Sequence, residues 1–151
     1  MADAWQLPSV PADELDRELM EEATALLLSR RREGFHSVAA VALSSSGRRY
    51  ASLDLRSRKN AVCAEPGAIA AAHSVGDYDI HRIAAVVLVG PDGRTGLISP
   101  CGSCRELINY QNPDCDVLFD VGGRMARIKA RDLFPFGGIA GQPEISGPPR
   151  A

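Results

Sequence analysis

Three cysteines and one glutamate fall into two short motifs. In "VCAEP" Cys63 precedes Glu65 by two residues, and "SPCGSC" holds Cys101 and Cys104. Thiolates are zinc ligands, and a catalytic zinc ion takes three protein ligands and keeps a fourth position open for water. A carboxylate beside that water can accept its proton and pass it to a leaving amine. We therefore predict a three-cysteine zinc site with Glu65 as its acid–base group and not as a ligand.

Two other interpretations of these motifs stay open at this point. In a reducing compartment a Cys-x-x-Cys pair can be a redox pair, although such a pair has no use for a separate Cys-x-Glu. A closed structural zinc site would need a fourth ligand, for which the chain offers Cys115, His36, His73 and His81. Three thiolates also leave a surplus of negative charge, which two helix N-termini and the cation of Arg105 would offset.

The elements that must position the motifs follow from apolar periodicity and turn residues. Helices are predicted over 11–32, 64–75 and 101–111 and a helical turn over 130–134, with strands over 36–45, 50–55, 83–90, 115–120 and 125–130. Asp13 or Ser9 is expected to cap the first helix. Residues 56–61 are interpreted as a polar connection and 91–100 as a loop. Both cysteine motifs then lie where a helix begins, and the order of elements indicates an α/β fold with helices on both faces of one mixed sheet.

Composition narrows the class of protein. The 151 residues fit one domain over 1–136, followed by a Gly/Pro-rich tail over 137–151. A net charge of −2 and 5% aromatic residues argue against a nucleic-acid partner. No apolar run approaches the roughly 18 residues of a membrane helix, and the acidic N-terminus lacks the features of a secretion signal. We expect a cytoplasmic protein whose partner is a small molecule.

The paired motifs resemble a known family. Cys63-Ala64-Glu65, followed by "PCGSCR" at 100–105, is similar to the signature of the small zinc-dependent cytidine deaminases, including blasticidin S deaminases. The resemblance covers roughly residues 11–136 and includes "DLFPF" near the end, which is similar to the family's C-terminal turn.

The resemblance implies a fold, a reaction and an assembly. The fold would be a three-layer α/β/α sandwich with a mixed five-stranded sheet. Cys63, Cys101 and Cys104 would hold Zn²⁺, and zinc-bound hydroxide would attack a cytosine-type ring while Glu65 shuttles the proton. Members with three-cysteine sites are commonly homotetramers in which neighbouring subunits complete each active site, a role that the tail could have.

The sequence also departs from the family pattern. The second strand of cytidine deaminases carries an "NxE" element that holds the ribose, whereas this chain has "YASLDLRSRKNA" there, with Asp54 as the nearest carboxylate. Pro66 stands where an arginine usually follows the catalytic glutamate, so Arg105 or another cation must offset the thiolate charge. The basic residues Arg56, Arg58 and Lys59 form either a solvated loop or a site for a carboxylate or phosphate of the substrate.

The predicted function is zinc-dependent hydrolytic deamination of a free cytosine nucleoside, of the cytidine, deoxycytidine or blasticidin S type, or of a related aminated heterocycle. The residues expected to contact the substrate are Asp54, Arg58, Lys59, Asn60 and Ala64. Three alternatives remain: a different small heterocycle that bears an anionic group, a base in RNA or DNA, and a catalytically inactive module stabilised by zinc.

Overall fold

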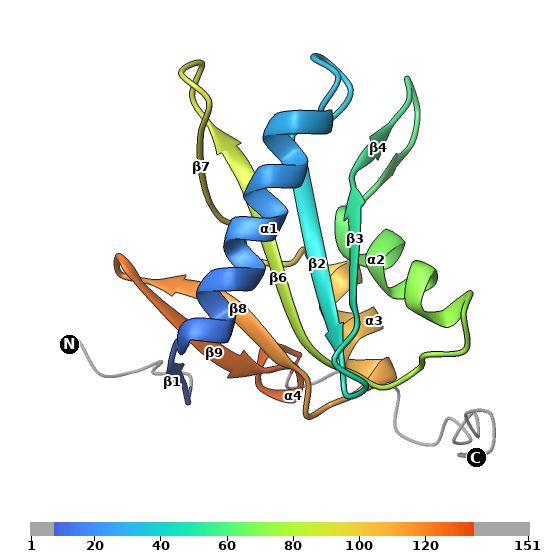
Figure 1. The fold of residues 1–151 in the computed structure, drawn as a ribbon, viewed down its shortest axis with the longest axis vertical. Coiled ribbons are helices and arrows are strands. Elements are labelled where there is room, and N and C mark those ends of the chain that lie inside the picture. Colours follow the sequence, from blue (N-terminus) through green and yellow to red (C-terminus); the bar gives the residue numbers. More distant parts are fainter. Residues whose placement is uncertain (1–7, 135–151) are drawn as a thin grey trace.

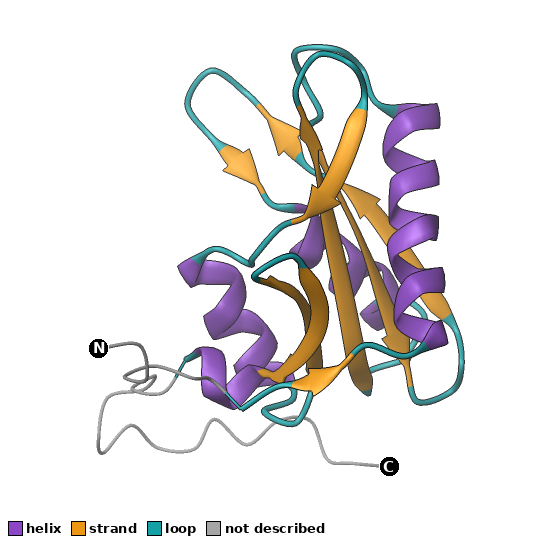
Figure 2. Cartoon of the chain, turned by 90° about the vertical axis from the view of Figure 1, so that its left-hand side faces the viewer, coloured by secondary structure: helices purple, strands orange, loops and turns teal. Residues whose placement is uncertain are grey.

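The computed structural model describes residues 8–134 and shows one mixed sheet between two layers of helices. Helix α1 covers one face of the sheet, while α2, α3 and α4 lie on the other (Figures 1 and 2). The helices are α1 (Glu14–Arg30), α2 (Ala64–His73), α3 (Gly102–Gln111) and α4 (Ala130–Leu133). The three-layer α/β/α sandwich is thus confirmed, and the predicted tail over 137–151 lies outside the described residues.

The sheet contains the five expected strands and two short additional ones. The five are β2 (Val38–Ser44), β3 (Arg49–Leu53), β6 (Ile80–Val89), β8 (Asp116–Val121) and β9 (Arg124–Lys129), to which β1 (Val10–Pro11) and β7 (Arg94–Leu97) are added. The order is β1-β9-β8-β6-β2-β3, with β7 also on β6. Strands β6 and β8 run parallel and the other pairs antiparallel, which makes the sheet mixed as predicted.

Two segments predicted to lack strands in fact contain them. The loop expected over 91–100 holds β7, and the polar connection over 56–61 belongs to a two-stranded ribbon of β4 (Leu55–Arg56) and β5 (Ala61–Val62). In Figure 1 this ribbon extends beyond the end of β3. Strands of two to four residues are too short to show the alternation of apolar and polar residues from which strands are predicted.

The core lies on both faces of the sheet. Along β2, Ala39, Val41 and Leu43 pack in a cluster with α1, while Ala42 packs in a cluster with α2 and α3. Successive side chains of a strand point to opposite faces, so one apolar strand serves both layers. Helix α1 buries one side of its surface through Leu19, Ala23 and Leu27, which recur every four residues. Among residues 8–134, no helix has both the length and the apolar character needed to span a bilayer.

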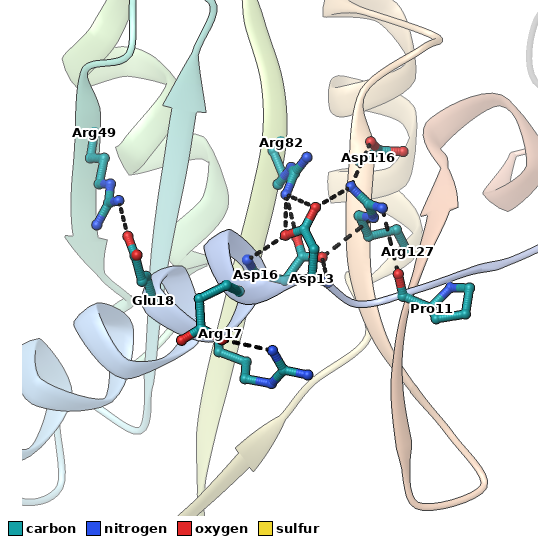
Figure 3. Close-up of polar contacts among 10 residues, drawn as sticks. Pro11, Asp13, Asp16, Arg17, Glu18, Arg49, Arg82, Asp116 and Arg127 are labelled. Atoms are coloured by element: carbon teal, nitrogen blue, oxygen red, sulfur yellow. Dashed lines mark hydrogen bonds and ion pairs between the residues drawn. The ribbon is translucent and has the colours of Figure 1, made fainter.

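An ion-pair cluster fixes the start of α1 to the sheet (Figure 3). Asp13 caps the helix as predicted, and its backbone amide donates to Asp16, 2.8 Å away, in a reciprocal capping box. Asp16 is fully buried and pairs with Arg82 of β6 at 2.8 Å and with Arg127 of β9 at 3.3 Å. Both arginines also pair with Asp13 at 2.9 Å. The cluster therefore links α1, β6 and β9, which lie far apart in the sequence.

Candidate active site

The starts of α2 and α3 bring the cysteine motifs together. Cys63 is the N-cap residue of α2 and directly follows β5, and Cys101 is the N-cap residue of α3, with Cys104 in its first turn. An N-cap side chain usually accepts a hydrogen bond from the first turn, but neither Cys63 nor Cys101 does so. Their sulfur atoms are therefore free to bind a metal ion, and the positive ends of two helix dipoles point at it.

The sulfur positions fit zinc. The Sγ atoms of Cys63 and Cys101 are 3.6 Å apart, and those of Cys63, Cys101 and Cys104 all lie within 4.8 Å of one another. Zinc–sulfur bonds of about 2.3 Å in a tetrahedron put sulfurs about 3.8 Å apart. Within residues 8–134 no further His, Cys, Asp or Glu joins this group of ligand atoms. The alternative of a closed site with Cys115, His36, His73 or His81 is therefore wrong for the described part of the chain.

The three thiols differ in their surroundings. The pKa of Cys101 is lowered, chiefly because the backbone amide of Cys104 faces its sulfur. Burial raises the pKa of Cys63, and it holds the pKa of Cys104 well above its usual range. Zinc binds thiolates, so binding must release the protons of Cys63 and Cys104, the two thiols with a raised pKa. We therefore expect the metal affinity of this site to increase with pH.

Glu65 lies in the first turn of α2, two residues from Cys63. Its side chain is buried, with 3% exposed, and no ion pair joins it to a cation within the described residues. Burial raises the pKa of its carboxyl group, and the negative charge of Asp54 adds to this rise. A carboxyl group whose pKa is moved toward neutrality can both accept and donate a proton, as general acid–base catalysis requires.

An open pocket of about 440 Å³ lies beside the cysteines. Its polar lining consists of Asp54, Arg56, Ser57, Lys59 and Asn60, and it reaches Cys63. Three of the predicted substrate residues thus line one pocket.

The other two predicted substrate residues do not line the pocket. Arg58 is exposed at the tip of the ribbon, and Ala64 is fully buried at the start of α2. Arg56, considered above as part of a possible anion site, also lines the pocket, and so does Ser57, which was not predicted. Their place follows from the β4–β5 ribbon, which the sequence pattern did not reveal.

Arg105 supports the loop that carries Cys101. Its Nε donates to the carbonyl of Pro100 at 2.9 Å, and Nη2 donates to Ser99 at 2.7 Å. The guanidinium is thus fixed beside the start of α3. The compensation of thiolate charge by Arg105 stays a prediction.

Residues 13–117 match the family described as the cytidine and deoxycytidylate deaminase zinc-binding region. The chain belongs to this family. It is 33% identical over 125 residues to a blasticidin-S deaminase of Bacillus cereus, a match that covers 80% of this chain and 89% of that protein. The resemblance drawn from the two motifs is confirmed, and the chain is a zinc-dependent deaminase of the hydrolase class.

Solved structures support the same fold. The cytidine deaminase from Bacillus anthracis superimposes with a TM-score of 0.71 at 20% identity, covering 82% of this chain and 89% of that one. The enzyme from Burkholderia pseudomallei gives a TM-score of 0.65 at 24% identity, covering 80% and 96%. The cytidine deaminase from Mycobacterium tuberculosis gives 0.66 at 23% identity, covering 85% and 100%. At these identities the likeness establishes the fold alone.

Proposed function

We propose that this deaminase hydrolyses the exocyclic amine of a free cytosine nucleoside or of a closely related aminated heterocycle. The proposal rests on the convergence of three cysteine sulfurs beside a buried carboxyl group that forms no ion pair with any cation of residues 8–134. The names of the related proteins, cytidine deaminase and blasticidin-S deaminase, supply the first substrates to test.

The residues of the site divide the chemistry between them. When bound to Cys63, Cys101 and Cys104, a zinc ion supplies Lewis-acid chemistry that lowers the pKa of a water ligand toward 7. Glu65 accepts a proton from the attacking water, and the two protons of this water end on the ring nitrogen and on the amine. The C–N bond breaks, ammonia leaves and a carbonyl forms on the ring. The burial of Glu65 keeps bulk water from exchanging this proton. Arg105 offsets part of the thiolate charge.

The substrate enters through the pocket beside Cys63. Its lining includes three of the residues predicted to contact substrate, Asp54, Lys59 and Asn60. The buried position of Ala64 leaves its backbone as the group that would bound the ring, whereas Arg58 is exposed and lies outside the pocket lining. An aminated heterocycle bearing an anionic group is a second candidate substrate, because Arg56 and Lys59 also line this pocket.

Free nucleosides are favoured over nucleic acid. The net charge of −2 gives no general attraction to phosphate backbones, and 5% aromatic residues provide few surfaces on which bases can stack. An inactive zinc-stabilised module is disfavoured because a purely structural site has no use for a buried acid beside its metal ligands.

We further propose that the protein is a cytoplasmic homotetramer. On the β4–β5 ribbon, Leu55 and Val62 face each other across the strands and are 60% and 43% exposed, which suits burial against another subunit. All four cysteines are free, as is usual in a reducing compartment. Light scattering on the wild type and on Leu55→Ser tests the assembly, and a monomeric wild type would contradict it.

A substrate screen tests the proposed function. Zinc-loaded protein is incubated with cytidine, deoxycytidine, blasticidin S, cytosine in single-stranded DNA and an aminopurine nucleoside, and ammonia release is measured. We expect release from at least one of the free cytosine nucleosides and none from DNA. Fully zinc-loaded protein that releases no ammonia from any compound would contradict the proposal.

A further inference from the structure

The carboxylate at the pocket wall is already engaged by the protein itself. Oδ1 of Asp54 accepts hydrogen bonds from the backbone amides of Ser37 at 2.8 Å and Val38 at 2.9 Å, and Oδ2 accepts one from Nε of Arg56 at 2.8 Å. The side chain is 6% exposed. Burial acts to raise the pKa of Asp54, but these amides and the guanidinium outweigh it, so the pKa is lowered and the group is ionised at neutral pH. Asp54 is therefore bound to the start of β2, and these bonds use three of the roughly four acceptor positions of its carboxylate.

The same contacts hold Arg56 in a defined orientation. Its Nε is bonded to Asp54, and Nη2 donates to the hydroxyl of Ser37. Arg56 keeps 51% of its side chain exposed and lines the pocket. A guanidinium has five N–H groups, of which these two bonds use two. The remaining N–H groups of a fixed, planar fork match the oxygens of a carboxylate or phosphate.

The charge of the pocket wall is positive. The charge of Asp54 is offset by Arg56, and Lys59 adds a cation that forms no ion pair within the described residues. Arg56 lies opposite Ala61 on the ribbon, and the β5 strand runs from there directly to Cys63. A molecule whose ring reaches the cysteines can therefore extend its other end toward the guanidinium.

We propose that Arg56, held in place by Asp54, is a specificity-determining residue that binds an anionic group on the substrate, either a carboxylate or a phosphate. This inference rests on the proposed function, because it assumes that the aminated ring lies at the cysteines. It assigns to Asp54 the role of positioning Arg56 and not of contacting the substrate. The pocket wall would then bind an anion and not a hydroxyl group.

The test compares matched neutral and anionic ligands in two variants. Cytidine, cytidine 5′-phosphate and the 5′-carboxylate of cytidine are assayed with zinc-loaded wild type, Arg56→Gln and Arg58→Gln, which removes a neighbouring exposed cation outside the pocket. We expect Arg56→Gln to raise KM for one of the anionic compounds about 10–100-fold with kcat maintained, and to change KM for cytidine less than about twofold. The compound that responds distinguishes phosphate from carboxylate. Arg58→Gln should change none of the KM values by more than about twofold.

A binding measurement separates this inference from the proposed function. Calorimetry on zinc-loaded Glu65→Gln protein, with and without Arg56→Gln, gives dissociation constants for the same compounds without turnover. Failure of every compound to release ammonia would contradict the proposed function, whereas anion binding that is unchanged by Arg56→Gln would overturn the inference. In the chain with native Arg56, added sodium chloride should weaken binding of the anionic compound and not of cytidine. Equal salt dependence for both would also overturn it.

Discussion

Two of the carboxyl groups buried among residues 8–134 lie in the first turn of a helix, and their surroundings differ. Asp16 at the start of α1 is paired with Arg82 and Arg127 and bonded to the backbone amide of Asp13 (Figure 3). Glu65 at the start of α2 is 3% exposed and has no cationic partner within the described residues, and burial raises its pKa.

This is the difference that we expect between an acid with a structural role and the catalytic acid proposed above. A buried ion pair fixes the elements that contribute to it, and removal of one member leaves an unpaired charge. A buried acid without a cationic partner has no fixed positive charge that holds it ionised, so it can both take up and release a proton. We therefore assign a stabilising role to the acid at the start of α1 and propose a chemical role for the acid at the start of α2.

The largest expected effect is the loss of metal binding in Cys104→Ala. Cys115→Ala is the matched control, because both thiols are 1% exposed in the same apolar cluster but only Cys104 belongs to the ligand group. We expect Cys104→Ala to lose more than the roughly 10–100-fold in zinc affinity that removal of an outer-shell partner costs. Competition with a chromophoric chelator measures it. Equal zinc affinities of the two variants would show that the ligand set is wrong.

The second prediction concerns stability alone. Asp16→Asn should lower the free energy of unfolding by about 3 kcal/mol, because two buried guanidinium groups lose an anion. Its zinc content and KM should be unchanged. Glu14→Gln breaks an exposed pair with Arg17 in the same turn and should cost less than about 1 kcal/mol. Urea unfolding compares them, and similar values for the two variants would remove the structural role given to Asp16.

The third prediction tests how α2 is positioned. A Cβ atom on Gly67 would lie 2.2 Å from Oγ and 2.9 Å from Cβ of Ser52 in β3, so Gly67→Ala should push the start of α2 outward. Although alanine favours helix by about 1 kcal/mol, we expect a net loss of about 1–3 kcal/mol of stability and a lower kcat.

Two variants make the third prediction specific. Gly67→Ala combined with Ser52→Gly removes the clash and should restore kcat. Ala71→Gly weakens the same helix at an exposed position without a clash and should leave kcat unchanged. An increase in the thermal unfolding midpoint of Gly67→Ala would show that a methyl group fits beside Ser52, and would contradict the prediction.

The last prediction concerns how the stability of the fold depends on pH through Asp77, which does not belong to the site and has a small expected effect. Hydrogen bonds from Ser44, Ser46 and Tyr50 lower the pKa of Asp77. Because the folded state favours the carboxylate, these bonds stabilise the fold above the unfolded pKa of about 3.9, and this contribution is lost as the pH falls through the lowered value. As the pH falls from about 5 to about 3, the unfolding midpoint of Asp77→Asn should therefore decrease less than that of the wild type. Parallel profiles would contradict this account.

The zinc site could be predicted from the sequence because its geometry is local. Cys101 and Cys104 are separated by three positions at a helix start, so one turn brings both sulfurs to the same side, and Cys63 and Glu65 share another first turn. Long apolar strands such as β6 were predictable for a similar reason, since burial on both faces produces a continuous apolar run.

The pocket could not be predicted because it depends on contacts between distant residues. Asp54 accepts hydrogen bonds from the backbone amides of Ser37 and Val38, 17 and 16 residues away in the sequence, which no side-chain pattern reveals. Arg82 and Asp16 pair across 66 residues. The β4–β5 ribbon, which separates Arg56 in the pocket from Arg58 outside it, has strands of only two residues.

The proposal that the buried carboxyl group of Glu65, beside three sulfurs, carries out proton transfer is tested by Glu65→Gln. Ammonia release is measured with the best substrate of the screen, at a zinc content equal to that of the wild type. The account predicts retained zinc, a free energy of unfolding no lower than that of the wild type, and a kcat reduced by about 100- to 10,000-fold. A zinc-loaded Glu65→Gln protein that turns over at the rate of the wild type would contradict it.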